Sequence, residues 1–200
     1  EAQLLVKPNM SIKASRVMRP KPKPTQPNEW WGIDMTKVMT LHGGWVYIVI
    51  VIDWCSKKVV GHYAGYQSKS WHWQLALDKA VNRQFPFGVR DHGVHLMSDN
   101  GCQPTSESFM KTCRILGLQQ AFTSYNNPKG NADTERMMRT LKEELLWLRE
   151  WNNLEEIDQA LDAWVAHYNS NYLHSALGYQ SPECFERGFY VGQETLLECA

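Results

Sequence analysis

Three runs of apolar residues follow one another near the start of the chain, with very short connections between them. The runs cover Trp30–Thr40, 45–53 and 57–66, and only residues 41–44 and 54–56 separate them. Runs rich in Val, Ile, Tyr and Trp are typical of strands. Because connections this short join neighbouring strands of opposite direction, the runs predict an antiparallel meander of three strands.

The pattern then changes to alternating helices and strands. Residues Ser70–Gln84 carry apolar side chains at helical spacing, and residues 106–116 predict a second helix that ends at Gly117. A short apolar run follows each predicted helix, at 94–98 and at 118–123. Strands joined through a helical crossover usually run parallel, so these two strands extend the sheet in parallel.

Two long amphipathic helices are predicted at 132–151 and 154–172. Their apolar stripes are Met138, Leu141, Leu145 and Leu148 in the first, and Ile157, Leu161, Trp164 and Tyr168 in the second. A meander of three strands, two crossover-linked strands and helices to cover both faces predict an α/β fold. Its centre is a five-stranded mixed sheet flanked by helices.

The two ends of the chain differ in composition from this middle part. Residues 1–27 carry six Lys and Arg side chains against one acid and are interrupted by prolines. We interpret them as an extended basic linker, a tether rather than a specific DNA contact. Residues 28–185 form the predicted core, and 186–200 a C-terminal tail.

The 200-residue chain has a formal net charge of zero, which is unusual for a protein that binds nucleic acid. No apolar run is long enough to span a membrane and no signal peptide is present, so we expect a cytoplasmic protein without membrane contact. The cysteines are odd in number and form no C-x-x-C pair, which predicts reduced thiols rather than disulfides or a zinc site; they are Cys55, Cys102, Cys113, Cys184 and Cys199.

Three carboxylates lie where this layout brings chemistry together. Asp34 lies inside the first predicted strand, where a charge that faces the core is costly without a partner or a metal ion. Asp99 ends the fourth strand, and ligands of open α/β sheets gather at the carboxyl ends of strands. Glu135 falls in the first turn of a helix. If the first and fourth strands are parallel neighbours, Asp34 and Asp99 can bind one hard cation through oxygen.

Each carboxylate also has a purely structural interpretation. Asp34 can be a core acid bonded to backbone, Asp99 can open an Asp-Asn-Gly turn, and Glu135 can be an ordinary helix-start acid. Asp53 is the main rival ligand, but its position before a turn favours a structural role.

Two basic residues follow Glu135 on the same predicted helix face. Arg139 and Lys142 stand four and seven residues after it. Side chains there can hold DNA phosphate, whereas the alternative is an ordinary salt-bridged helix face. The preceding loop at 125–130 is interpreted as a functional loop beside the site.

The acids lie in three motifs separated by characteristic spacings. These are Trp31-Gly32-Ile33-Asp34, then Ser98-Asp99-Asn100-Gly101, and then Asn131-Ala132-Asp133-Thr134-Glu135-Arg136, with thirty-five residues between Asp99 and Glu135. They resemble the acidic triad of retroviral integrases and insertion-sequence transposases. The third numbered group of bacterial insertion sequences resembles this chain most closely, from about Pro27 to Phe185. Further similarities are Val51-Ile52-Asp53, Leu141-Lys142-Glu143-Glu144, and the closing residues from Tyr168-Asn169 to Ser181-Pro182.

The resemblance implies a ribonuclease-H-like fold and a DNA transposase or integrase core. It implies that Asp34, Asp99 and Glu135 are catalytic and hold two Mg²⁺ ions, with Mn²⁺ as a substitute, and it favours DNA contact for Lys142. Two such ions, about 3.5 to 4 Å apart, suit phosphodiester hydrolysis and strand transfer. The resemblance also implies self-association on DNA, a helix-turn-helix region before Glu1, and the bacterial cytoplasm.

Two alternatives stay open from the sequence. A nuclease of the same architecture would cut DNA but not join strands, and a decayed core would bind DNA without catalysis. The group usually has arginine and proline where Tyr172 and Leu173 stand, which keeps the decayed core in consideration. The closing motif argues against the nuclease, and the intact acids argue against the decayed core.

Overall fold

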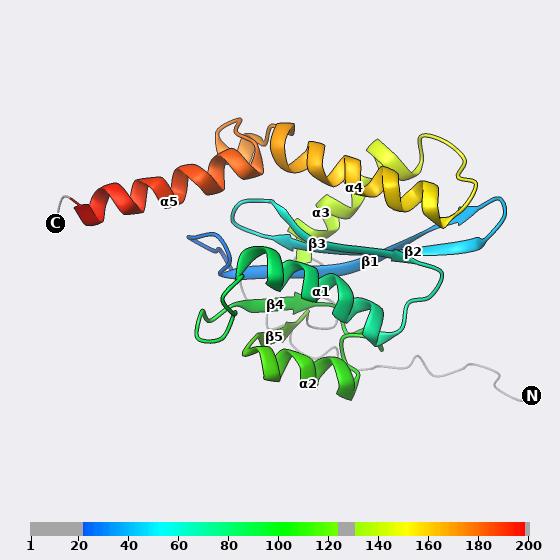
Figure 1. Ribbon diagram of the computed structural model, residues 1–200, viewed down its shortest axis with the longest axis horizontal. Helices are drawn as coiled ribbons and strands as arrows, with labels where there is room; N and C mark the ends of the chain where they lie inside the picture. The colour runs from blue at the N-terminus through cyan, green and yellow to red at the C-terminus, as the bar shows by residue number, and fades with distance from the viewer. Residues whose placement is uncertain (1–21, 124–130, 199–200) are drawn as a thin grey trace, which may run out of the picture.

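The computed structural model describes residues 22–123 and 131–198, and a five-stranded sheet lies at its centre (Figure 1). The strand order is β3-β2-β1-β4-β5. β1 pairs antiparallel with β2 and parallel with β4, β2 pairs antiparallel with β3, and β4 pairs parallel with β5. The strands are β1 (Trp30–Thr40), β2 (Gly44–Asp53), β3 (Val59–Gly65), β4 (His95–Ser98) and β5 (Gln119–Phe122). The predicted five-stranded mixed sheet is confirmed.

Helices cover both faces of this sheet, with α1 in front of it and α3 behind it in Figure 1. The helices are α1 (Ser70–Gln84), α2 (Glu107–Leu116), α3 (Ala132–Leu141), α4 (Leu154–Asn171) and α5 (Pro182–Glu198), with a π-helix η2 (Lys142–Leu146) and a 3₁₀ turn η3 (Ser175–Leu177). Alternation along β2 supplies both cores: Val49 and Val51 pack on the α1 side, while Ile48, Ile50 and Ile52 pack on the α3 and α4 side.

The free edge of β3 is held by one side chain of α4. The Oδ1 of Asn169 accepts from the backbone N–H of Val59, and its Nδ2 donates to the carbonyl of the same residue, both at 2.9 Å. This buried amide reproduces the pairing that a neighbouring strand would provide, so α4 closes the sheet edge. Asn169 belongs to the closing motif of the sequence, and this contact is its structural role.

The helix predicted at 132–151 is wrong at its end, because helical structure stops at Leu146. α3 ends at Leu141, and the π-helix continues to Leu146, with the Trp147 amide donating to the Lys142 carbonyl at 2.9 Å. An i→i+5 turn holds an extra residue and rotates the residues after it out of the α-helical phase. Leu148, predicted in the core stripe, is therefore 70% exposed, while Leu146 is 2% exposed.

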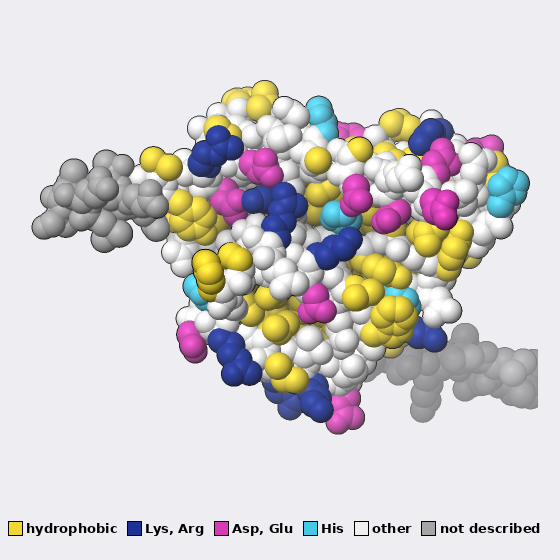
Figure 2. All heavy atoms as spheres, viewed as in Figure 1, with side chains coloured by type: hydrophobic (Ala, Val, Ile, Leu, Met, Phe, Trp, Pro, Cys, Tyr) yellow, Lys and Arg dark blue, Asp and Glu magenta, His cyan; other side chains and the backbone are white. Residues whose placement is uncertain are grey.

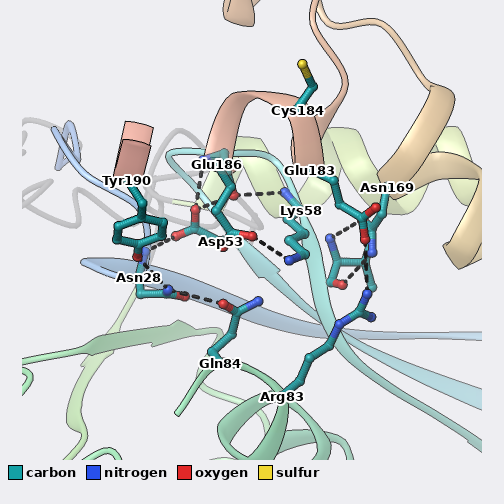
Figure 3. Close-up of polar contacts among 12 residues, drawn as sticks. Asn28, Asp53, Lys58, Arg83, Gln84, Asn169, Glu183, Cys184, Glu186 and Tyr190 are labelled. Atoms are coloured by element: carbon teal, nitrogen blue, oxygen red, sulfur yellow. Dashed lines mark hydrogen bonds and ion pairs between the residues drawn. The ribbon is translucent and has the colours of Figure 1, made fainter. Parts of the chain in front are cut away.

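Helix α5 runs through residue 185, the expected end of the core, and the residues of its first turns contact the packed body (Figure 3). Glu186 is buried and forms an ion pair with Lys58 of the β2–β3 connection at 2.5 Å. The side-chain Nδ2 of Asn28 donates to the Tyr190 hydroxyl at 3.3 Å and to the Gln84 side-chain oxygen at 3.2 Å. The predicted tail thus begins within a helix whose first turns join the packed body.

The face that carries α1 is mixed in charge, as Figure 2 shows, with acidic side chains gathered over α4 and basic ones interspersed. Mixed charge favours neither a nucleic acid nor an acidic partner on this face. Among the helices described, none is both long and apolar enough to cross a membrane.

Removing the amine of the buried pair tests how α5 is attached. Lys58→Met leaves Glu186 buried without its counter-charge, and we expect a loss of about 3–5 kcal/mol in the free energy of unfolding. Urea denaturation measures the effect. The double variant Lys58→Met/Glu186→Leu should recover most of the loss, since no uncompensated charge remains. Equal stability of Lys58→Met and the unaltered chain would contradict the buried-pair account.

Candidate active site

Two of the three predicted acids lie at the same height of the sheet, Asp34 within β1 and Asp99 directly after the end of the parallel neighbour β4. The register of β1 and β4 pairs Gly32 with Met97. Asp34 lies two residues after Gly32 in β1, and Asp99 lies two residues after Met97, directly past the last residue of β4; a spacing of two keeps each on the face of its paired neighbour. Met97 packs in the cluster that contains α3, so both carboxylates lie on the α3 side of the sheet.

The third acid is brought to this face by a very close contact between α3 and β1. A Cβ added to Gly32 would lie 1.9 Å from the Thr134 Oγ1 and 2.5 Å from the Trp54 Nε1, so those atoms occupy the space of a side chain. The Trp54 indole N–H donates to the Thr134 hydroxyl at 3.0 Å, and both side chains are buried. Glu135 follows Thr134 directly, so its position depends on this contact.

The electrostatics of Asp34 reflect the gathering of these groups. Burial raises the pKa of Asp34 to about 6, and the Met35 backbone N–H, which donates to Oδ1 at 2.8 Å, opposes this rise. The charges of Asp99 and Glu135 raise the pKa further, whereas the Lys142 ammonium lowers it. The charges of Asp99, Glu135 and Lys142 thus all act on the pKa of Asp34.

The chemistry of this acid set fits a hard divalent cation, although the side chains do not form a closed ligand cluster. Within 22–123 and 131–198, no three His, Cys, Asp or Glu side chains stand close enough together to hold a metal ion. Asp99 directs Oδ1 to the Gly101 amide at 3.0 Å. Like charges repel, and carboxylate oxygens are the ligands that Mg²⁺ prefers. A bound cation would offset the repulsion by which Asp99 and Glu135 raise the pKa of Asp34.

The rival ligand Asp53 has a structural role. It is fully buried, and its carboxylate accepts from the Asn28 amide at 3.0 Å and from the Ser56 amide and hydroxyl at 2.7 and 2.6 Å. Burial raises its pKa to about 6 despite these bonds. Its oxygens therefore tie the start of β1 to the β2–β3 turn, as the position before a turn indicated.

The two predicted basic residues differ in their surroundings. Lys142 acts on Asp34, whereas Arg139 is exposed and forms an ion pair with Glu143 at 3.1 Å. Lys142 therefore lies close enough to the candidate site to act on Asp34, whereas Arg139 belongs to a salt-bridged helix face. The predicted functional loop 125–130 lies outside the described residues.

Sequence reasoning missed the roles of Gly32, Trp54 and Thr134. A glycine inside a strand often marks a close backbone approach, which was the one available signal. The two side chains that fill the space come from positions 54 and 134, and the sequence carries no sign that they meet.

Comparison with known proteins places the chain among integrase and transposase sequences. Two family models, each described as an integrase core domain, match residues 24–128 and 116–182. The transposase for insertion sequence element IS904 of Lactococcus lactis is 31% identical over 82% of this chain and 64% of that protein. The putative transposase InsK for IS150 of Escherichia coli is 28% identical over 89% of this chain and 61% of that protein. The chain thus spans about three fifths of these curated relatives.

A solved structure has the same fold. The catalytic core domain of HTLV-2 integrase in complex with magnesium, in a trimeric form, superimposes with a TM-score of 0.61 at 16% identity, covering 82% of this chain and 99% of that one. At this identity the likeness concerns the fold, which is ribonuclease-H-like.

A methyl group at position 32 should separate α3 from β1. We expect Gly32→Ala to lower the free energy of unfolding by about 1–3 kcal/mol, because the new Cβ overlaps buried atoms. Gly188→Ala is the matched control, since a Cβ there meets open space. Adding Thr134→Ala should restore part of the loss. If denaturation curves give Gly32→Ala and Gly188→Ala the same free energy of unfolding, the close contact is refuted.

The raised pKa of Asp34 predicts a pH-dependent cost. Its pKa lies near 6 in the folded protein against 3.8 ordinarily, so the folded state retains a proton that the unfolded chain releases. Stability relative to Asp34→Asn should therefore fall as pH rises from about 4 to about 6, by about 3 kcal/mol, and stay level above. Denaturation of both proteins across this range checks it, and parallel curves would exclude a raised pKa. Asp53 is present in both proteins, so its contribution cancels in the difference in stability between them.

Proposed function

The chain belongs to the integrase core domain family, and from this premise we propose that it is the catalytic core of a DNA transposase. The proposal rests chiefly on one observation: Asp34, Asp99 and Glu135 come from β1, the end of β4 and α3, and the last two act electrostatically on the first. The matches to transposases of IS904 and IS150 support DNA as the substrate.

Asp34, Asp99 and Glu135 would hold two Mg²⁺ ions, for which Mn²⁺ can substitute. When bound, such ions lower the pKa of an attacking hydroxyl and stabilise the leaving oxygen. The magnesium complex of the HTLV-2 integrase core supports this choice of cation. Asp34 must be ionised to act as a ligand, and Lys142 favours that form.

The reaction proposed for this site has two phosphoryl transfers. Water first attacks a phosphodiester at a transposon end, and the bond to the 3′ oxygen breaks to leave a 3′-hydroxyl. That hydroxyl then attacks a phosphodiester of the target, so that one P–O bond forms as another breaks. Lys142 would hold a backbone phosphate beside Asp34, and Arg139 would take part only after leaving Glu143.

The proposed organisation extends beyond the site. We take 28–185 as the catalytic core, 1–27 as a tether, and a preceding helix-turn-helix region as the part that binds transposon ends. The two transposases matched are longer than this chain, which supports further regions. The trimeric form of the HTLV-2 core supports self-association, which we propose takes place on DNA. Bacterial cytoplasm is the proposed location.

Strand cleavage and joining on a branched duplex test the proposal, because branching positions the reacting hydroxyl without end recognition. We expect activity with Mg²⁺ or Mn²⁺ and a loss of more than about a hundredfold in Asp99→Asn or without metal. Asp91→Asn is the matched control, since Asp91 is exposed and its left-handed backbone suits asparagine.

The outcomes separate the alternatives. Metal-dependent cleavage without joining would indicate a nuclease, and products that survive Asp99→Asn would exclude the assigned acids. DNA binding without either reaction would indicate a decayed core.

A further inference from the structure

A polar pocket lies beside α3, lined by residues of the helix that neighbour Glu135 but not by Glu135 itself. It has a volume of about 190 Å³, and its wall combines α3, the β2–β3 turn, the end of α4 and the segment that leads into η3. The residues used below are Lys57, Arg136, Thr140, Tyr172 and His174, all of which line it.

The pocket carries more positive than negative charge. Lys57 and Arg136 are its two permanent cations, and Asp133 is the acid that lines it. Lys57 donates to Asp133 at 3.3 Å, so this acid offsets one cation. Within the described part of the chain, Arg136 forms no ion pair with a carboxylate. A guanidinium without a carboxylate partner presents a planar set of donors to an anion.

His174 adds a polar atom that has no partner. Its ring packs against Tyr172 at 4.9 Å and edge-on against Tyr168 at 5.3 Å between centroids. Its Nε2 is shielded from solvent and, among the described residues, meets no hydrogen-bond partner. Burial lowers the pKa of His174, and the charges of Lys57 and Arg136 lower it further. An anion bound in the pocket would give this unpaired nitrogen a hydrogen-bond partner, and the positive charges nearby would attract the anion.

The pocket adjoins an open hollow that is lined by one of the three candidate acids, Glu135. Arg136, Thr140 and Tyr172 also line the open hollow that contains Glu135 and Arg139. Arg136 lines both hollows and Glu135 lines the second, so a DNA strand bound at Glu135 would have Arg136 within its reach. This position favours a phosphodiester of the bound DNA strand over a free anion as the ligand of the pocket.

We propose that this pocket binds one backbone phosphate of the DNA strand that runs past Glu135, through Arg136, Lys57 and His174. The inference rests on the proposed function. A phosphate contact reads no base, so the pocket would set the position of the strand relative to Glu135.

The test is the salt dependence of DNA binding, measured by fluorescence anisotropy with a labelled branched duplex and the full chain. Each phosphate contact contributes about 0.7–0.9 to the slope of log K against log salt. Arg136→Gln should lower the slope by this amount and weaken binding about tenfold at about 0.1 M salt. Arg114→Gln, which removes an equal charge from α2, should leave the slope unchanged and affinity within about twofold.

His174→Phe separates a binding role from a packing role. Phenylalanine keeps the ring against Tyr168 and Tyr172 but removes Nε2. The proposal expects weaker DNA binding at unaltered thermal stability, whereas unaltered DNA binding would overturn the role of Nε2. In the unaltered chain, DNA should shift the His174 ring nitrogen signals in NMR spectra, and Arg136→Gln should abolish the shift.

Inorganic phosphate distinguishes the two sources of the anion. If phosphate alone shifts the His174 signals and DNA does not, the pocket is a free-anion site and the DNA assignment is overturned. If the chain binds and cleaves DNA but Arg136→Gln behaves like Arg114→Gln, only the pocket proposal fails. If the unaltered chain neither binds nor cleaves DNA, the proposed function fails and the pocket proposal with it.

Discussion

The close packing of α3 on β1 determines where the rest of the candidate site lies. Gly32 has no side chain, and the Thr134 hydroxyl, held by the Trp54 indole, fills the space. Asp34 lies two residues after Gly32, and Glu135 one residue after Thr134. The separation of these two acids is therefore set by packed backbone rather than by flexible side chains, as a preorganised site requires. The parallel register with β4 then brings Asp99 to the same face.

The same packing makes the charged form of Asp34 costly. Burial raises its pKa to about 6, and neighbouring acids add to the rise. Cation binding and ionisation are then linked, because a ligand carboxyl must lose its proton. Asp53 has a pKa of about 6 as well, yet its oxygens accept bonds from Asn28 and Ser56. Hydrogen-bond partners, rather than the size of a pKa shift, separate the structural acid from the candidate catalytic one.

Local patterns predicted the sheet, because the apolar runs and the short connections between them depend on neighbouring residues alone. The π-helix at Lys142–Leu146 was not predicted, because the apolar residues of this segment also fit α-helical spacing. The start of the tail escaped as well: Glu186 pairs with a residue 128 positions away, and no local signal records such a contact. The places of the three acids, on β1, after the end of β4 and in the first turn of α3, were predictable from strand ends and motif resemblance, whereas their role as ligands stays a proposal. Their separation, the Thr134 contact and the pocket of His174 depend on tertiary packing that a single sequence does not reveal.

Calorimetric titration with Mn²⁺ near neutral pH tests most directly whether Asp34, Asp99 and Glu135 form one cation site. We expect saturable binding by the unaltered chain and a loss of at least about tenfold in affinity in both Asp99→Asn and Glu135→Gln, because each removes a carboxylate ligand. Asp91→Asn should bind as the unaltered chain does. Equal affinity in all four proteins would contradict the account, because the acids that meet at Asp34 would then play no part in holding a metal.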